Sequence, residues 1–205
     1  MGTVALITGA SSGIGREMAL IHAASGGDLV IVARRADKLE ELKREIESST
    51  QSKVLVVAAD LTDPAAPAAI YEAVRAAGIE VEYLINNAGF GGRGKFHERA
   101  WQPDLEMIQV NVLALTELTR LFLPAFVKRG TGRVLNVSST AAFVPGPLQA
   151  VYYATKAYVT SFSNAIAEEL HDTKITVTAL MPGATATEFA STSGMDKTSL
   201  FERTS

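Results

Sequence analysis

The sequence predicts an α/β fold: a doubly wound parallel sheet with helices on both faces, formed as a single domain by residues 1–205. Short apolar runs rich in Val, Ile and Leu alternate with amphipathic segments along the chain, which is typical of strand–helix–strand units. The runs lack strict polar alternation, so they are expected to be buried on both faces. Residues 8–15 add a glycine-rich turn directly after the first run.

The expected elements follow in chain order. Strands are predicted at residues 4–7, 29–33, 54–58, 81–85, 133–137 and 175–180. Helices are predicted from about residue 15, and at residues 38–47, 64–77, 104–128 and 152–170. Residues 191–205 are polar and weakly patterned, so a loop or a mobile end is expected there.

Composition excludes several functional classes. A net charge of −3 and a pI near 5.7 argue against a nucleic-acid surface. The chain has no cysteine, so it has neither disulfides nor thiolate chemistry, as suits a cytoplasmic protein. No apolar run approaches the length of a membrane span, so no membrane partner is expected. The histidines His22, His97 and His171 lack metal-ligand spacing, so no metal is expected.

The turn after the first strand has the spacing T-G-x-x-x-G-x-G. Its glycines let the backbone turn sharply and approach a pyrophosphate, which the N-terminus of the next helix then binds through free N–H groups. A plain glycine turn is the alternative, but the position between a strand and a helix favours a Rossmann-type dinucleotide site. The predicted cofactor-binding residues here are Gly9, Ser11, Ser12, Gly13, Ile14 and Gly15.

The second strand ends in Arg34 and Arg35, with neutral Ala33 before them. An acidic residue at this place would bind the ribose 2′-hydroxyl of NAD, whereas arginine accommodates the 2′-phosphate of NADP. The pair therefore favours NADP(H), with Arg34 the better candidate; two surface arginines are the alternative. Arg16, just after the glycine turn, is ambiguous and could be a surface residue.

Further cofactor contacts are expected where the third, fourth and sixth strands end, because these ends share one edge of the sheet. Asp60 could accept a hydrogen bond from the adenine amino group, or it could cap a turn. Asn86 and Asn87 could pin neighbouring strands, and a Pro-Gly turn at Pro182 could face the nicotinamide or be a plain turn. The cofactor-binding residues predicted here are Asp60, Leu61, Asn87, Ala88, Gly89, Pro182, Gly183, Thr185 and Thr187.

Tyr152 and Lys156 stand four residues apart, so a helix places them on one face. A nearby cation favours the phenolate, so the pair can act as a tuned acid/base that also contacts the cofactor. Ser139, at the end of the fifth strand, could donate a hydrogen bond to a substrate oxygen. Two serines at a strand end would otherwise be an ordinary cap.

Together these motifs resemble the short-chain dehydrogenase/reductase superfamily over about residues 3–189. The resemblance implies that Tyr152 is the general acid/base and that Lys156 lowers its pKa and binds the nicotinamide ribose. It implies that Ser139 orients the substrate and that Asn111 holds a water in a proton relay. Family members usually continue with another helix and strand, whereas this sequence stops within the expected substrate-loop region, residues 190–205.

The resemblance implies an oxidoreductase that transfers a hydride between NADP(H) and a carbonyl or alcohol. It also implies a homodimer or homotetramer built on the helices at 104–128 and 152–170. Two alternatives remain open. One is a non-catalytic NADP-binding sensor or scaffold, although such proteins commonly lose the tyrosine or the lysine. The other is a dehydratase or epimerase, whose relatives usually carry a different glycine spacing and a larger C-terminal domain.

Overall fold

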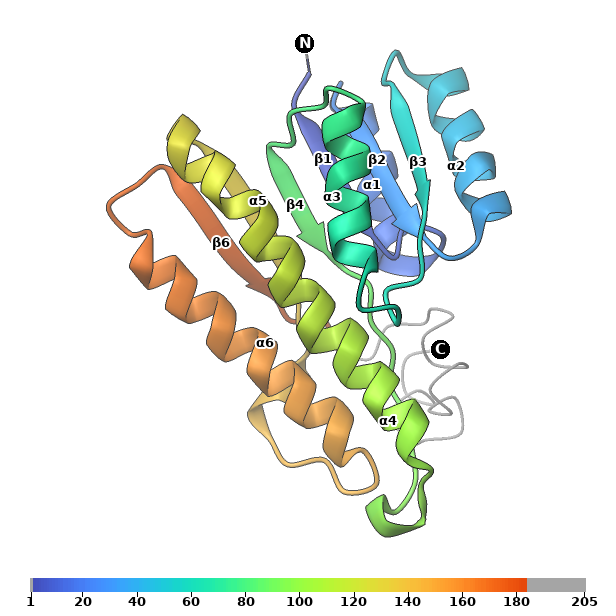
Figure 1. Ribbon diagram of the computed structural model, residues 1–205, viewed down its shortest axis with the longest axis vertical. Helices are drawn as coiled ribbons and strands as arrows, with labels where there is room; N and C mark the ends of the chain where they lie inside the picture. Colours follow the sequence, from blue (N-terminus) through green and yellow to red (C-terminus); the bar gives the residue numbers. More distant parts are fainter. Residues whose placement is uncertain (1, 184–205) are drawn as a thin grey trace.

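The computed structural model describes residues 2–183. They form one six-stranded parallel sheet in the order β3-β2-β1-β4-β5-β6, with helices on both faces (Figure 1), which confirms the predicted doubly wound fold. The chain crosses from one half of the sheet to the other after β3, so β1 and β4 lie side by side at the centre. The strands are β1 (Val4–Thr8), β2 (Asp28–Ala33), β3 (Val54–Ala58), β4 (Tyr83–Asn86), β5 (Gly132–Val137) and β6 (Ile175–Leu180).

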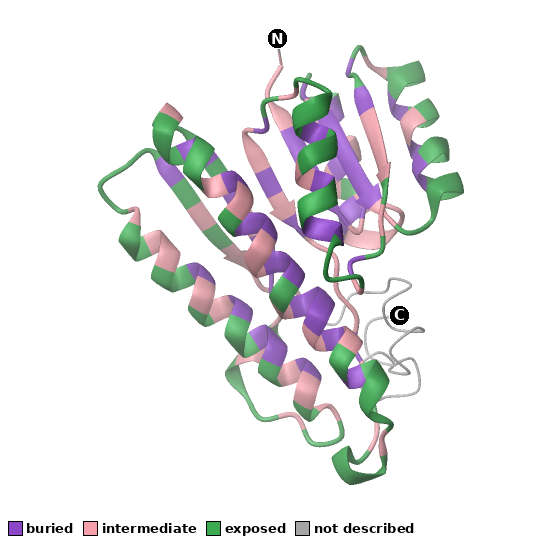
Figure 2. Ribbon diagram, in the orientation of Figure 1, coloured by how far each residue is buried: buried purple, intermediate pink, exposed green. Residues whose placement is uncertain are grey.

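Alternate strand residues point to two separate hydrophobic cores. Leu6 of β1 packs in one core with α3 (Ala66–Ala76) and α5 (Leu115–Arg129). Its neighbour Ile7 packs in the other with α1 (Gly13–Ala24) and α2 (Ala36–Ser49). Figure 2 shows the central strands buried and the helices buried along one stripe only. This double burial explains why the strand sequences are continuously apolar.

The helix α6 (Ala150–Glu169) lies beside α5 on the α3 face of the sheet (Figure 1). Asn136 of β5 donates to Ser163 of α6 (2.9 Å), and Asn86 of β4 donates to Thr119 of α5 (3.1 Å) and to Asn136 (2.9 Å). All of these residues are buried. The expectation that the asparagines at the end of β4 pin neighbouring strands is therefore confirmed for Asn86.

The predicted helix at 104–128 is longer and less regular than expected. It begins as α4 (Trp101–Ile108), widens into a π-helical segment, η2 (Gln109–Ala114), and continues as α5. Bulges of this kind frequently mark functional sites, and this one contains Asn111.

One helical stretch, Trp101–Arg129, is long and apolar enough to cross a membrane by length and composition. The expectation concerned a continuous apolar run, and charged residues such as Glu117 and Arg120 interrupt this stretch, but an 18-residue window within it still has a mean hydropathy of 1.5. Core helices of soluble proteins pass the same test, and 44% of this window is buried inside the fold.

Other boundaries differ by a few residues. The first helix begins at Gly13 instead of near residue 15, and β4 begins at Tyr83 instead of residue 81. Two short 3₁₀ helices, η1 (Phe96–Glu98) and η3 (Thr140–Phe143), were not expected. The predictions for residues 184–205, including the loop or mobile end, lie outside the described residues.

Candidate active site

An open cleft of about 810 Å³ runs along the carboxyl ends of the strands, where ligands bind in open α/β sheets. Most of the sequence-predicted site residues line it together. They are Gly9, Ser11, Ser12, Gly13, Ile14, Arg34, Arg35, Asp60, Leu61, Asn87, Ala88, Gly89, Ser139, Tyr152, Lys156, Pro182 and Gly183. Gly15 and Asn111 do not line the cleft, and Thr185 and Thr187 lie outside the described residues.

The glycine turn needs its glycines for conformation and for space. Gly9 and Gly13 have φ values of +68° and +56°, which other residues adopt only with strain. A Cβ atom on Gly15 would collide with the Asn87 amide and the Gly9 carbonyl oxygen. Gly15 therefore acts behind the turn, by letting α1 pack closely against it, and not as a cleft-lining contact.

The first turn of α1 is open to an anion. Ser12 occupies the N-cap position in an extended conformation, but its side chain makes no capping hydrogen bond. The first N–H groups of a helix have no partner within the helix and carry its positive dipole end. Because backbone turn, helix end and cleft coincide here, the residues present fit the pyrophosphate of a dinucleotide.

Thr8 is a residue whose role the sequence did not reveal. Its hydroxyl donates to the Ile85 carbonyl (3.4 Å) and accepts from the backbone N–H groups of Asn87 and Ala88 (both 3.0 Å). The Asn87 side chain in turn donates to the Thr8 carbonyl (2.9 Å). These bonds fasten the end of β1 to the end of β4, so the glycine turn and the Asn87–Gly89 wall hold a fixed relative position.

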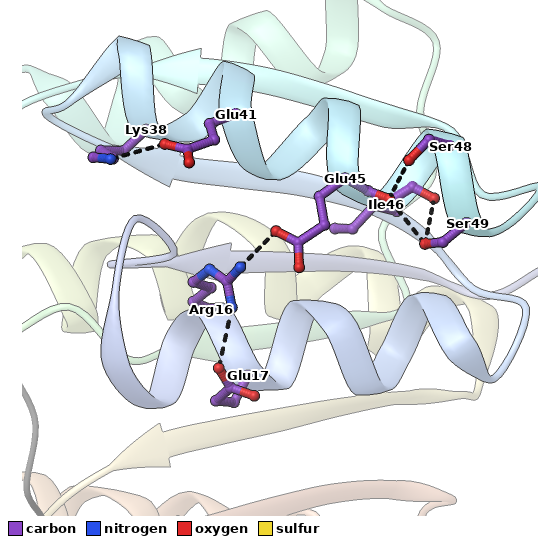
Figure 3. Close-up of polar contacts among 8 residues, drawn as sticks. All are labelled: Arg16, Glu17, Lys38, Glu41, Glu45, Ile46, Ser48 and Ser49. Carbon is purple, nitrogen blue, oxygen red and sulfur yellow. Dashed lines mark hydrogen bonds and ion pairs between the residues drawn. The ribbon is translucent and has the colours of Figure 1, made fainter.

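Two exposed arginines stand at the end of β2. Arg34 and Arg35 both line the cleft, and Arg35 donates through Nη2 to the Ser11 hydroxyl (3.1 Å). Arg16 has a structural role instead. It pairs with Glu17 on its own helix and with Glu45 on α2 (Figure 3), so it ties α1 to α2 and the surface interpretation is the right one.

Asp60 lines the cleft and also accepts a hydrogen bond from the Thr62 N–H through Oδ1 (3.0 Å). The interpretation of Asp60 as a turn cap is therefore confirmed, and its contact with an adenine amino group stays a prediction. The turn fixes the carboxylate where β3 ends, beside Leu61, which is 7% exposed.

Ser139 and Tyr152 meet across the cleft. Burial raises the pKa of the Tyr152 phenol above its ordinary value of 10.0, while a hydrogen bond with Ser139 works in the opposite direction. The Ser139 hydroxyl also accepts from the Ala141 N–H (3.1 Å). This contact makes Ser139 the N-cap of η3, so a cap and a substrate-facing hydroxyl are the same residue.

Lys156 is buried beneath the cleft floor. Its ammonium donates to the Val137 carbonyl (2.8 Å), and burial lowers its pKa from 10.5 to about 8. The Nζ atom lies 5.8 Å from the centre of the Tyr152 ring. The expectation of a lowered Tyr152 pKa is not met as a net result, because burial of the phenol has the largest effect and raises that pKa overall.

Ser138 holds the backbone of Lys156 in place and was missed by the sequence analysis. Its hydroxyl donates to the Lys156 carbonyl (2.9 Å) and shares a hydrogen bond with Thr160 (2.7 Å). The signal was present as a second serine beside Ser139, but only the structure shows that Ser138 contacts the Lys156 carbonyl and Thr160, whereas Ser139 contacts Tyr152. Ser138 therefore holds α6 in place, and both serines line the cleft.

Asn111 lies behind the catalytic residues in the π-helical segment. Its amide accepts from the Phe90 N–H (3.1 Å) and donates to the Phe90 carbonyl (3.0 Å) and to Thr155 on α6 (3.1 Å). A Cβ atom on Gly89 would lie 3.0 Å from Asn111 Oδ1 and 3.4 Å from Lys156 Nζ. Gly89 thus lets the amide and the ammonium approach the same stretch of backbone.

The residues that the structure describes contain no group of three or more His, Cys, Asp or Glu side chains able to hold a metal ion. The cleft combines the glycine turn with Arg34 and Arg35 at the end of β2. Ser139, Tyr152 and Lys156 line its other end. This arrangement suits proton transfer to a substrate placed beside a dinucleotide.

Comparison with known proteins agrees with this geometry. The chain matches the family described as short chain dehydrogenase over residues 3–198. It is 34% identical over 198 residues to the very-long-chain 3-oxoacyl-CoA reductase of Bos taurus, an alignment that covers 93% of this chain and 62% of that relative. It is 35% identical to the NADP-dependent 3-hydroxy acid dehydrogenase of Schizosaccharomyces pombe, covering 92% and 74%.

Among solved structures, the chain resembles a short-chain dehydrogenase from Sphingobium yanoikuyae in complex with NADPH. The TM-score is 0.90 at 37% identity, covering 98% of this chain and 80% of that one. The sequence thus spans about three fifths of the length of the Bos taurus relative. Fold, motifs and family match agree, and the chain belongs to the short-chain dehydrogenase family.

Proposed function

We propose that this protein is an NADP(H)-dependent oxidoreductase that interconverts a carbonyl and an alcohol. One observation carries the proposal: Ser139, Tyr152 and Lys156 lie in the same cleft as the glycine turn of Gly9 and Gly13. A binding protein needs only the turn, whereas proton transfer needs the other three residues.

The cofactor seat runs from the end of β2 to the end of β6. The glycine turn and the N-terminus of α1 would hold the pyrophosphate, and Arg34 would pair with the 2′-phosphate. Asp60 would accept from the adenine amino group, and Gly183 stands at the nicotinamide end of the cleft. When bound, the reduced nicotinamide supplies the hydride that is added to the carbonyl carbon.

The protein residues supply the proton and stabilise the developing charge. Tyr152 donates its phenolic proton to the carbonyl oxygen, and its raised pKa keeps that proton in place at neutral pH. Ser139 donates a hydrogen bond to the same oxygen. The buried Lys156 ammonium provides positive charge close to the phenolate that remains, where the low dielectric strengthens the interaction.

Assembly and location are part of the same proposal. The neighbouring helices α5 and α6 expose Val127 and Tyr158, and the adjoining segment η2 exposes Leu113. The family resemblance assigns a dimer interface to this helix pair. We therefore propose a homodimer or a homotetramer, located in the cytoplasm and free of membrane and nucleic acid. Half-exposed apolar side chains on adjacent helices support a protein–protein contact.

The test is NADPH oxidation, followed at 340 nm, with aldehydes, ketones and 3-oxoacyl thioesters of increasing size. Consumption of NADPH with any class supports the proposal and identifies the substrate chemistry. Tight NADPH binding without consumption across the whole panel would contradict it, and would favour the sensor or scaffold alternative.

A further inference from the structure

Arg99 forms a buried ion pair outside the cleft. Its Nε and Nη2 atoms donate to Oδ1 of Asp104 at 2.9 and 2.7 Å. The Asp104 side chain is only 4% exposed and the Arg99 side chain 18%, whereas the neighbouring pair Lys95–Glu98 is 62% and 57% exposed. Exposed pairs hold little in place. A buried pair, once broken, leaves an uncompensated charge, so its geometry is strongly maintained.

The remaining guanidinium nitrogen of Arg99 holds the rim loop (residues 90–94), an irregular segment whose first residue, Phe90, lines the cleft. Nη1 donates to the Arg93 carbonyl (2.9 Å). Gly92 packs so closely that a Cβ atom there would collide with the guanidinium, and Gly94 has a φ of +150° with Arg99 Cγ 3.0 Å from a Cβ position. The loop is thus fitted around the Arg99 side chain.

The rim loop connects directly to the catalytic residues. Phe90, at its start, packs with Met107 and Tyr152 in one hydrophobic cluster, and Asn111 holds the Phe90 backbone. At its end, the Gly94 N–H donates to the Leu148 carbonyl (2.8 Å), four residues before Tyr152. Asn111 therefore fixes one end of the loop, and Arg99 fixes the other.

We propose that Arg99, locked by Asp104, is a positioning residue that sets the substrate end of the cleft through the rim loop. The inference rests on the proposed function and deepens it. Arg99 touches neither the glycine turn nor Arg34, so it acts on the carbonyl substrate and leaves the cofactor seat unchanged. The guanidinium binds the Asp104 carboxylate and the Arg93 carbonyl at the same time through separate N–H groups. A lysine ammonium lacks this planar array of donors, so it cannot replace the arginine.

Kinetic constants separate this role from others. We expect Arg99→Leu to raise the KM of a bulky carbonyl substrate about tenfold, with kcat and the Kd of NADPH changed less than about twofold. Arg99→Lys keeps the charge but loses the fork, so a similar rise in KM is expected. Gly92→Ala displaces the guanidinium from the loop side and should give the same pattern. The control Glu98→Gln breaks the exposed neighbouring pair and should leave all three constants unchanged.

The double variant Arg99→Leu/Asp104→Asn distinguishes positioning from simple stabilisation. Arg99→Leu alone leaves the Asp104 carboxylate buried and unpaired, so its Tm falls; the second change removes that charge and should recover most of the Tm. The double variant still lacks the Arg99 guanidinium that holds the rim loop, so the KM of the carbonyl substrate should stay high. Recovery of KM together with Tm would overturn the proposal, as would unchanged KM in Arg99→Leu.

A readout that needs no turnover keeps this inference apart from the proposed function. Trypsin cleavage after Arg93, which is exposed in the rim loop, should be several times faster in Arg99→Leu and in the double variant than in the unaltered protein or Glu98→Gln. If the unaltered protein reduces no carbonyl, the proposed function fails, but the cleavage rates still test whether Arg99 holds the rim loop. Equal cleavage rates in all four proteins would overturn the proposal that Arg99 holds the rim loop in place.

Discussion

At the scale of single residues, the titration of Lys156 sets the pH range of the reaction. Its pKa of about 8 means that the folded enzyme holds the ammonium charge below pH 8 and loses it above. We therefore expect kcat/KM for carbonyl reduction to be constant below pH 8 and to fall above it. In Lys156→Arg the guanidinium stays charged, so whatever activity remains should persist to higher pH. A falling limb near pH 8 in that variant would assign the ionisation to another group.

The same burial has a consequence for stability. The pKa of Lys156 is lower in the folded protein than its ordinary value of 10.5, so the unfolded state binds more protons between about pH 8 and 10.5. Stability therefore gains a favourable contribution from this residue as the pH rises through that window. Urea titrations of the unaltered protein and Lys156→Met isolate the contribution, since only the lysine protein should show it.

We expect Arg34 to determine the choice of cofactor. A charge-assisted contact to the 2′-phosphate contributes about 1.5–3 kcal/mol, so Arg34→Gln should raise the KM of NADPH roughly 10- to 100-fold and leave that of NADH nearly unchanged. Arg34→Asp should go further and favour NADH. Arg75→Gln, which removes an equally exposed arginine on α3, is the control. Parallel changes with both cofactors would contradict the phosphate role.

At the scale of elements, buried asparagines fasten the sheet to its helices. Asn136 accepts from Asn86 and donates to Ser163, so it joins β4, β5 and α6. Asn136→Ala would leave two buried polar groups without their partner, which costs about 2–4 kcal/mol in the free energy of unfolding. Ser163→Ala removes one bond of this network, together with the Ser163 bond to the Val159 carbonyl within α6, and should cost less. Urea denaturation measures both; an equal or smaller loss for Asn136→Ala would show that the network is not cooperative.

The π-helical segment positions the Asn111 side chain between the rim loop and α6. It lies at Gln109–Ala114, between two α-helical stretches, and displays the Asn111 amide toward Phe90 and Thr155. A regular helix would turn that residue relative to α6. The segment therefore places one side chain where the rim loop, α6 and the backbone beside Gly89 converge.

At the scale of the whole molecule, α5 and α6 form the surface on which we expect self-association. Tyr158 and Thr116 share a hydrogen bond across the two helices (3.0 Å), and Tyr158 stacks on Phe162. Tyr158→Arg places a like charge on both sides of a two-fold interface, so light scattering after size-exclusion chromatography should show a shift to monomer. A mass unchanged from that of the unaltered protein would place the interface elsewhere.

The sequence predicted the sheet because its strands are buried on both faces, so that Val, Ile and Leu runs such as the one before Thr8 leave a clear signal. It predicted the cleft because the glycine turn and Ser139 directly follow strands, and Tyr152 and Lys156 share one face of a helix. It could not predict side-chain direction. The different partners of Ser138 and Ser139, the hydrogen bonds between Asn111 and Phe90 and the Arg99–Asp104 pair depend on tertiary contacts that no local pattern records.

The central claim is that Tyr152 donates the proton, and the most direct test is Tyr152→Phe. The substitution removes one hydroxyl from a ring that is 6% exposed, so packing and the cofactor seat should be preserved. We expect the rate of NADPH oxidation by Tyr152→Phe to fall at least about 100-fold. The Kd of NADPH, measured by its fluorescence, should change less than about twofold. Turnover above roughly a tenth of the unaltered rate, at unchanged Kd, would contradict it.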